Sequence, residues 1–267
     1  MKQKNKVYQR KKLRTDMLDE QNKPKFCQKY DFGISLNKEN LKNNKFLVVN
    51  APFLDELGSV CAREIKNILC CELKQFFNIK KYKKILFVGL GNETITADSL
   101  GPKILKKLFM SKGLDFECQT FGISPSVEAK TGLETADVIK AIANEFKPDL
   151  VVLFDTLASA KIERLGCSFQ LNTKGISAGS GVGNFNKKID KKFLKINCLA
   201  VGVPFMIYAE SLANIIKENK SKLKNLVLTP NNIDRQINVC AEIIADCFNE
   251  VLFPTLTEEE IKNLTSC

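Results

Sequence analysis

Two unbroken apolar segments constrain the fold of this chain more than any other feature of its sequence. They lie at residues 84–90 and 149–155, and a glycine or an aspartate closes each of them. A continuous apolar run, in place of an alternating one, is typical of a strand that is buried on both faces. A stretch with helical spacing separates the two segments. This alternation of strand and helix predicts an α/β fold with a mostly parallel central sheet.

The rest of the chain extends the same pattern without a visible linker or internal repeat. We expect a basic tail over residues 1–16 and one α/β domain over residues 17–267. Thr131 and Glu134 have the spacing of a capping box, which predicts a helix ending before Pro148. Further strands are expected at 46–50, 117–121, 167–172 and 197–204, and further helices at 55–78, 99–109, 207–218 and 231–250.

The composition fits a globular protein with reduced thiols. Apolar residues make up 44% of the 267 residues, which is enough for a sizeable core. The ten cysteines have irregular spacing without a C-x-x-C motif, and residues 1–20 lack the apolar centre of a signal peptide. No apolar run is long enough to span a membrane. We therefore expect a cytoplasmic protein with mostly buried thiols.

The chain contains no histidine. This absence excludes Ser-His-Asp and Cys-His relays, together with zinc sites that need imidazole. A general base must then be a carboxylate, a lysine, a tyrosine or a thiolate. We expect no metal and no cofactor.

The net charge of +11 is concentrated in part at the N-terminus, where residues 1–12 carry six lysines and arginines and no acid. Such a segment is typical of a solvated tail or of an arm that binds nucleic acid. Tyr8 is the one aromatic residue among these charges, so base stacking has little support.

Two aspartates follow the predicted buried strands. Asp98 comes after the strand at 84–90, and Asp155 closes the run at 149–155. The carboxyl ends of parallel strands share one edge of a sheet, so these side chains are expected to face each other. Two close carboxyl groups cannot both ionise easily, which provides an acid and a base without histidine. The alternative is structural: either aspartate could cap a helix or turn that follows it.

The glycine-rich segments do not form a nucleotide site. Residues 89–94, GLGNET, fail the dinucleotide fingerprint because Thr94 stands in place of the third glycine. The segment GSGVGN at 179–184 lacks the strand and helix that should flank it. These glycines are better explained by a close approach of the backbone to a peptide or to a neighbouring loop.

Several motifs together resemble the germination protease family of spore endopeptidases. The resemblance runs from about Arg14 to the C-terminus, and its motifs occur in the family's order and spacing. They are VGLGNETITADSLGP, TGLETADVIKAIANEFKPDLVVLFDTLAS, IERL, GSGVGN, AVGVP and LVLTPNNID.

The resemblance implies a phosphorylase/hydrolase-like three-layer α/β sandwich and an endopeptidase that degrades small acid-soluble spore proteins inside the spore. The family's two essential aspartates match Asp98 and Asp155. Asn92, Gly181 and Asn184 lie in matching motifs and are expected to support the site or the substrate. We expect no stable contact with nucleic acid and no contact with a membrane. We also expect the chain to form a homo-oligomer.

The family is also made as a zymogen that trims its own N-terminus. RTDML at 14–18 resembles the family's processing region, which points to the bond between Asp16 and Met17. The loop at 125–132 departs from the family pattern and brings Glu128 near the expected site. Tyr208 stands where the family has an aspartate, which is a second departure from the family pattern.

Two alternatives stay open. One is a metal-dependent peptidase like those that mature hydrogenases, although that family uses a histidine on nickel. The other is a degenerate relative that binds spore proteins without cleaving them. Peptidyl-tRNA hydrolase shares GLGN but depends on histidine, so it is set aside.

Overall fold

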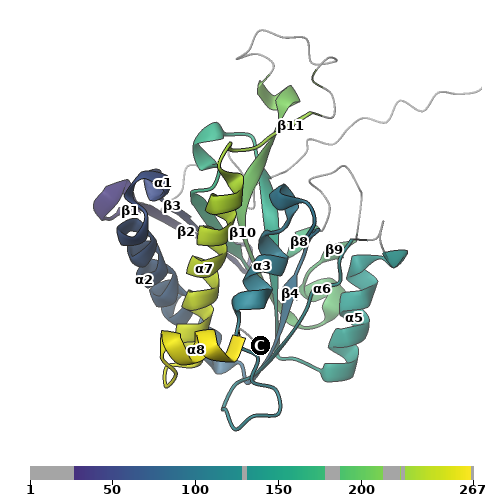
Figure 1. The fold of residues 1–267 in the computed structure, drawn as a ribbon. Helices are drawn as coiled ribbons and strands as arrows, with labels where there is room; N and C mark the ends of the chain where they lie inside the picture. Colours follow the sequence, from purple (N-terminus) through teal and green to yellow (C-terminus); the bar gives the residue numbers. More distant parts are fainter. Residues whose placement is uncertain (1–26, 128–130, 178–186, 213–222, 224–225, 266–267) are drawn as a thin grey trace, which may run out of the picture.

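A large mixed β-sheet forms the centre of the molecule, with helices on both of its faces (Figure 1). The computed structural model describes residues 27–127, 131–177, 187–212, 223 and 226–265. The α/β fold expected from the sequence is confirmed. Within these residues, no helix is both long and apolar enough to cross a membrane.

The strand order of the main sheet is β1-β2-β3-β7-β10-β6-β4-β5, with β11 paired to the end of β10. The four strands from β10 to β5 pair in parallel, and the pairs from β1 to β10 are antiparallel. The strands are β1 (Cys27–Lys29), β2 (Ser35–Leu41), β3 (Asn44–Asn50), β4 (Lys84–Gly89), β5 (Gln119–Ile123), β6 (Leu150–Ser159), β7 (Ser168–Asn172), β10 (Asn197–Tyr208) and β11 (Val227–Leu228).

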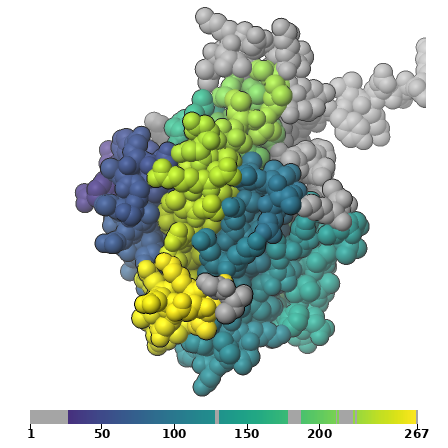
Figure 2. All heavy atoms as spheres, viewed as in Figure 1, coloured from purple at the N-terminus to yellow at the C-terminus, as the bar shows by residue number. Residues whose placement is uncertain are grey.

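The helices form the two outer layers. Figure 2 shows α2, α7 and α3 side by side on one face, with α8 in yellow at their lower end. On the other face lie α5, α6 and a small hairpin of β8 (Ile176–Ser177) and β9 (Lys188–Ile189). The helices are α1 (Leu54–Leu57), α2 (Ser59–Gln75), α3 (Leu100–Lys107), α5 (Thr135–Phe146), α6 (Lys191–Leu194), α7 (Ile233–Leu252) and α8 (Glu258–Thr265).

Alternation along the central strands divides the core into two halves. Ile85 and Phe87 of β4 pack toward α2, α3 and α7, and their neighbours Leu86 and Val88 pack toward α5. Successive side chains on a strand point to opposite faces, so a strand covered on both sides must be apolar throughout. This requirement explains why the apolar runs at residues 84–90 and 149–155 are continuous.

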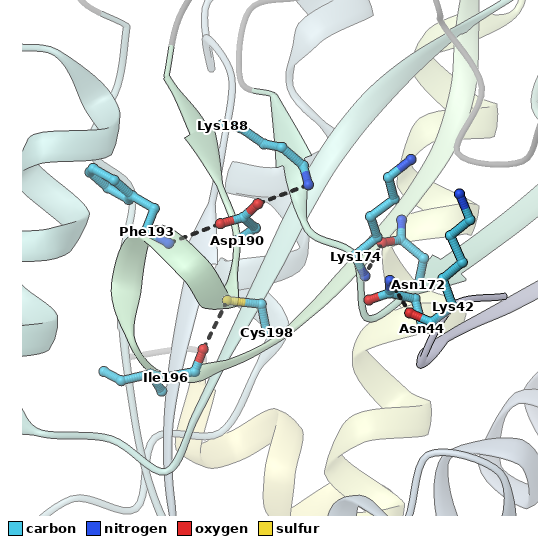
Figure 3. A network of polar contacts seen from close by, with 9 residues as sticks. All are labelled: Lys42, Asn44, Asn172, Lys174, Lys188, Asp190, Phe193, Ile196 and Cys198. Atoms are coloured by element: carbon cyan, nitrogen blue, oxygen red, sulfur yellow. Dashed lines mark hydrogen bonds and ion pairs between the residues drawn. The ribbon is translucent and has the colours of Figure 1, made fainter. Parts of the chain in front are cut away.

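Charged side chains stabilise the short elements on the α5 face. Asp190 precedes α6 and accepts a hydrogen bond from the Phe193 backbone N–H at 2.9 Å, as an N-cap should (Figure 3). Its other oxygen binds Lys188 Nζ at 2.9 Å. These bonds keep the pKa of Asp190 below its usual value against the opposing effect of partial burial.

Some expected boundaries are wrong. The helix at 55–78 is broken at Gly58, which has a φ of 54° and separates α1 from α2. The capping box does not form, because α5 begins at Thr135 after Glu134, which makes no side-chain cap bond. The strand expected to end at Asp155 continues to Ser159, and β10 continues to Tyr208 where a helix was expected. In both cases parallel pairing between β6 and β10 extends the strands.

The start of α3 lies unusually close to the ends of β4 and β6. A Cβ atom on Gly101 would lie 2.4 Å from the Leu90 oxygen and 2.5 Å from the Phe154 oxygen. Both atoms belong to the backbone, so neither can swing away. A glycine at this position lets the helix pack directly on the two strand ends.

We expect Gly101→Ala to destabilise the protein by about 3 kcal/mol or more, because overpacking against backbone cannot relax. Alanine would otherwise favour a helix by about 1 kcal/mol. Urea denaturation measures the difference. Gly122→Ala is the control, since a Cβ there would meet only the flexible tips of Leu105 and Met110 and should cost less. Equal stability of Gly101→Ala and the wild type would contradict this packing argument.

Candidate active site

Asp98 lies in the connection between β4 and α3. It ends the 3-10 turn η3 (Thr96–Asp98) and is half-buried. Its Oδ2 accepts a hydrogen bond from the Asn92 backbone N–H at 2.8 Å, and its backbone oxygen accepts from the same N–H at 3.0 Å. The N-cap of α3 is Ser99, which makes no side-chain cap bond. The alternative that Asp98 caps this helix is therefore wrong.

Asp155 lies within β6, at the point where the neighbouring strand ends. The last pair between β4 and β6 joins Gly89 and Phe154, and β6 then continues beside β10 with Asp155 opposite Gly202. Only 8% of Asp155 is exposed. A carboxyl group inside a strand cannot cap a turn, so the structural alternative is wrong for this residue too.

The two carboxyl groups interact electrostatically. Burial raises the pKa of Asp98 from its usual 3.8 to about 6, and the hydrogen bond from Asn92 lowers it in part. Burial also raises the pKa of Asp155 well above 3.8. The nearby Asp98 raises it further, against a hydrogen bond from the Thr156 backbone N–H. Both carboxyl groups therefore hold their proton more tightly than an exposed aspartate does, because burial disfavours the charged form and Asp155 also lies near Asp98.

Glycine makes the bend before Asp98 possible. Gly91 has a φ of 109°, and a Cβ there would lie 2.0 Å from the Asp98 backbone oxygen. The expectation that a glycine of this segment allows the close approach of a neighbouring loop is confirmed here. Asn92 is buried, and its Oδ1 accepts from the backbone N–H of Thr94 at 3.1 Å and from its hydroxyl at 2.9 Å. Asn92 therefore shapes the loop that carries Asp98.

Thr156 is a neighbour of the site that no motif in the sequence indicated. Its Oγ1 accepts a hydrogen bond from the Leu100 backbone N–H at 3.3 Å, and it is 6% exposed. A hydroxyl residue inside an apolar strand was the available signal. Its partner lies far away in the sequence, so the contact itself could not be read there.

The other expected site residues cannot be placed. Glu128, Gly181 and Asn184 lie outside the described residues, as do Asp16 and Met17. Tyr208 ends β10, and its buried hydroxyl oxygen has no hydrogen-bond partner in the described part of the chain. In the same part of the chain, no group of three or more Cys, Asp or Glu side chains is arranged to bind a metal ion.

A separate groove of about 500 Å³ lies between α2 and α7. Leu54, Arg63, Val239 and Asp246 are among the residues that line it, and neither Asp98 nor Asp155 is. The electrostatic pair is therefore distinct from this groove.

We expect the buried charge of Asp98 to destabilise the folded chain as the pH rises. A raised carboxyl pKa means that the folded state binds the proton more tightly than the unfolded state between about pH 4 and pH 6. Stability is thus lost as the pH rises through this window. Asp98→Asn should remove that loss and gain about 1–2 kcal/mol at pH 7.5 relative to pH 4.5, allowing for the partial exposure of the group.

Urea denaturation at the two pH values measures this gain. Asp149→Asn is the control, because Asp149 accepts hydrogen bonds from the backbone N–H groups of Lys83 and Lys84 at the amino-terminal end of the strands, opposite to the end where Asp98 lies. It should give no gain. A loss of stability in Asp98→Asn at pH 7.5 would show that the charge is stabilised where it lies.

Comparisons with known proteins identify the family of this chain. The sequence profile of the germination protease family, Peptidase A25, matches residues 34–219. A germination protease of Caldanaerobacter subterraneus subsp. tengcongensis is 31% identical over 263 residues, covering 82% of this chain and 81% of that protein. One of Clostridium perfringens (strain SM101) is 30% identical over 275 residues and covers 85% of both.

A solved structure is also similar. The NiFe hydrogenase maturation protease HycI from Thermococcus kodakarensis KOD1 matches 68% of this chain and 99% of its own, with 17% sequence identity and a TM-score of 0.39. The family match covers well over half of the chain, and the relatives align over most of their length. This chain belongs to the germination protease family.

Proposed function

We propose that this chain is an endopeptidase of spore germination that hydrolyses small acid-soluble spore proteins with Asp98 and Asp155 as its acid–base pair. Membership of the family supports a protease that acts in germination. The observation that carries the assignment of residues is that the half-buried Asp98 lies close enough to the buried Asp155, where β4 ends, to raise the pKa of Asp155. They come from separate segments and have different environments.

The difference in environment suggests different roles. Asp98 is the more exposed group and ionises at about pH 6, so it serves as the base that takes a proton from the attacking water. Asp155 stays protonated and gives its proton to the nitrogen of the scissile amide as the C–N bond breaks. The water oxygen forms the new bond to the carbonyl carbon. Transfer of one proton from Asp98 to Asp155 then restores the starting state.

The proposal extends to maturation and location. Residues 1–16 form a basic propeptide, and the enzyme removes it by cleaving the Asp16–Met17 bond. The enzyme acts in the spore interior as a homo-oligomer and uses neither a metal nor a cofactor. The resemblance of RTDML to the family's processing region supports the cleavage site.

The first test replaces the two carboxyl groups. Asp98→Asn and Asp155→Asn should each lower single-turnover cleavage of a small acid-soluble spore protein by about 10³-fold or more. The double variant should lose little beyond either single one, because groups that act as a unit are non-additive. Asp149→Asn serves as the control and should cleave at the normal rate.

Thermal melts of each variant separate lost chemistry from lost folding. Near-normal rates for either single variant would refute the pair. The same assay after dialysis against EDTA should be unchanged. Loss of activity that one added metal restores would favour a metal-dependent peptidase.

The second test concerns maturation. The purified full-length chain should be poorly active at first and should acquire a new N-terminus at Met17 on incubation, as read by N-terminal sequencing and intact mass. Asp98→Asn should keep Met1, since the cleavage depends on the same site. Full activity in a chain that still begins at Met1 would contradict the propeptide assignment.

A further inference from the structure

Thr156 contacts both parts of the candidate site. It follows Asp155 directly in β6 and therefore shares the backbone of that residue. Its hydroxyl oxygen accepts from the Leu100 N–H, at the first residue of α3 and two residues after Asp98. One residue thus joins the strand that carries Asp155 to the helix that follows Asp98.

The bond satisfies a group that would otherwise lack a partner. The first N–H groups of a helix have no acceptor within the helix, and the N-cap residue Ser99 supplies no side-chain cap. The Ser99 hydroxyl is directed elsewhere and donates to the Thr96 oxygen at 2.9 Å. Thr156 therefore acts as a cap that comes from another element of the fold.

The hydrogen bond between Thr156 and Leu100 also limits how far the start of α3 can move away from β6. Packing limits how closely the two can approach. Close contact of Gly101 with the Phe154 oxygen stops α3 from moving nearer to β6. Steric repulsion does not stop α3 from moving away from β6. Among the described residues, the Thr156 hydroxyl supplies the side-chain hydrogen bond that joins the start of α3 directly to β6.

We propose that Thr156 is a positioning residue whose hydroxyl fixes the separation of Asp98 and Asp155 by anchoring the start of α3 to β6. This inference rests on the proposed function of the two aspartates. The hydroxyl itself need not touch the substrate. Its effect reaches the reaction through the placement of Asp98, and a small misplacement of a catalytic group can cost about 10²-fold in rate.

Within the described ranges, few other charged groups act on the two carboxyl groups. Asp98 is the charged side chain that acts on Asp155, and the Asn92 backbone is the polar group that acts on Asp98. Asp234 of α7 binds the Thr96 hydroxyl at 3.0 Å, at the opposite end of the same turn. A change in the placement of Asp98 should therefore appear directly in the titration of both carboxyl groups.

The test compares Thr156→Val with Thr156→Ser and with a matched control. Valine keeps the shape and removes the acceptor, and serine keeps the acceptor. The control is Thr120→Val in β5. It removes a fully buried hydroxyl, which accepts a hydrogen bond from the Ser111 backbone N–H at 3.0 Å. The readouts are kcat and KM across pH, and carboxyl titration of Asp98 and Asp155 by ¹³C NMR.

We expect Thr156→Val to lower kcat by about 10- to 100-fold with little change in KM. Water should enter between the loosened segments, so the acidic limb should move down by about 0.5 pH unit or more. Thr156→Ser should restore the rate to within about threefold of the wild type, as retention of the hydrogen bond predicts. Thr120→Val should melt earlier and keep the wild-type kcat and pH profile.

The outcomes separate this inference from the proposed function. A wild-type kcat and titration in Thr156→Val would overturn the positioning role, and so would an equal pH shift in Thr120→Val. Should the valine variant not fold, Thr156→Ala is titrated in its place under the same criteria. Normal cleavage by Asp98→Asn would instead refute the proposed function, and the NMR titration would still decide whether Thr156 fixes the pair.

Discussion

The close packing of α3 on the ends of β4 and β6 is the constraint on which the candidate site depends. Gly101 meets the backbone oxygens of Leu90 and Phe154, and the Leu90 N–H donates to the Phe154 oxygen at 2.8 Å. Three segments of backbone thus meet without side chains between them. Asp98 precedes this junction and Asp155 follows Phe154 directly. Their proximity is a consequence of backbone contact, which is more rigid than contact between side chains.

The same junction accounts for the electrostatics. The loop from Gly91 to Asp98 folds back on itself, because the Asn92 N–H donates to both the carboxyl Oδ2 and the backbone oxygen of Asp98. Asp155 lies beside β10 on one side, just past the end of β4 on the other, and is nearly inaccessible. Two carboxyl groups of equal intrinsic acidity therefore have unequal solvation. In the proposed reaction, unequal solvation is what allows one of them to act as the acid and the other as the base.

Much of this could be predicted from the sequence, because the relevant signals were local or followed from topology. The apolar runs at 84–90 and 149–155 predicted buried parallel strands, and parallel strands bring Asp98 and Asp155 to one edge. The extent of β6 beyond Asp155 could not be predicted, since it depends on pairing with residues 203–207 of β10. The contact of Thr156 with Leu100 depends on how α3 docks, which no local pattern encodes. The absence of a capping bond at Glu134 shows the converse case, where a local signal was present and tertiary packing decided otherwise.

The distribution of charge in the chain supports the proposed division of labour between the aspartates. The chain has 41 lysines and arginines, so a cation near any carboxylate would be unremarkable. Elsewhere the acids do pair in this way, as Glu134 and Asp137 do with Lys187. Among the residues that the structure describes, the groups that shift the pKa values of Asp98 and Asp155 include no lysine and no arginine. A nearby cation would lower the pKa of both groups and ionise both, leaving no acid to protonate the leaving nitrogen. In a chain without histidine, keeping positive charge away from this pair is thus as important to the proposed chemistry as bringing the two carboxyl groups together.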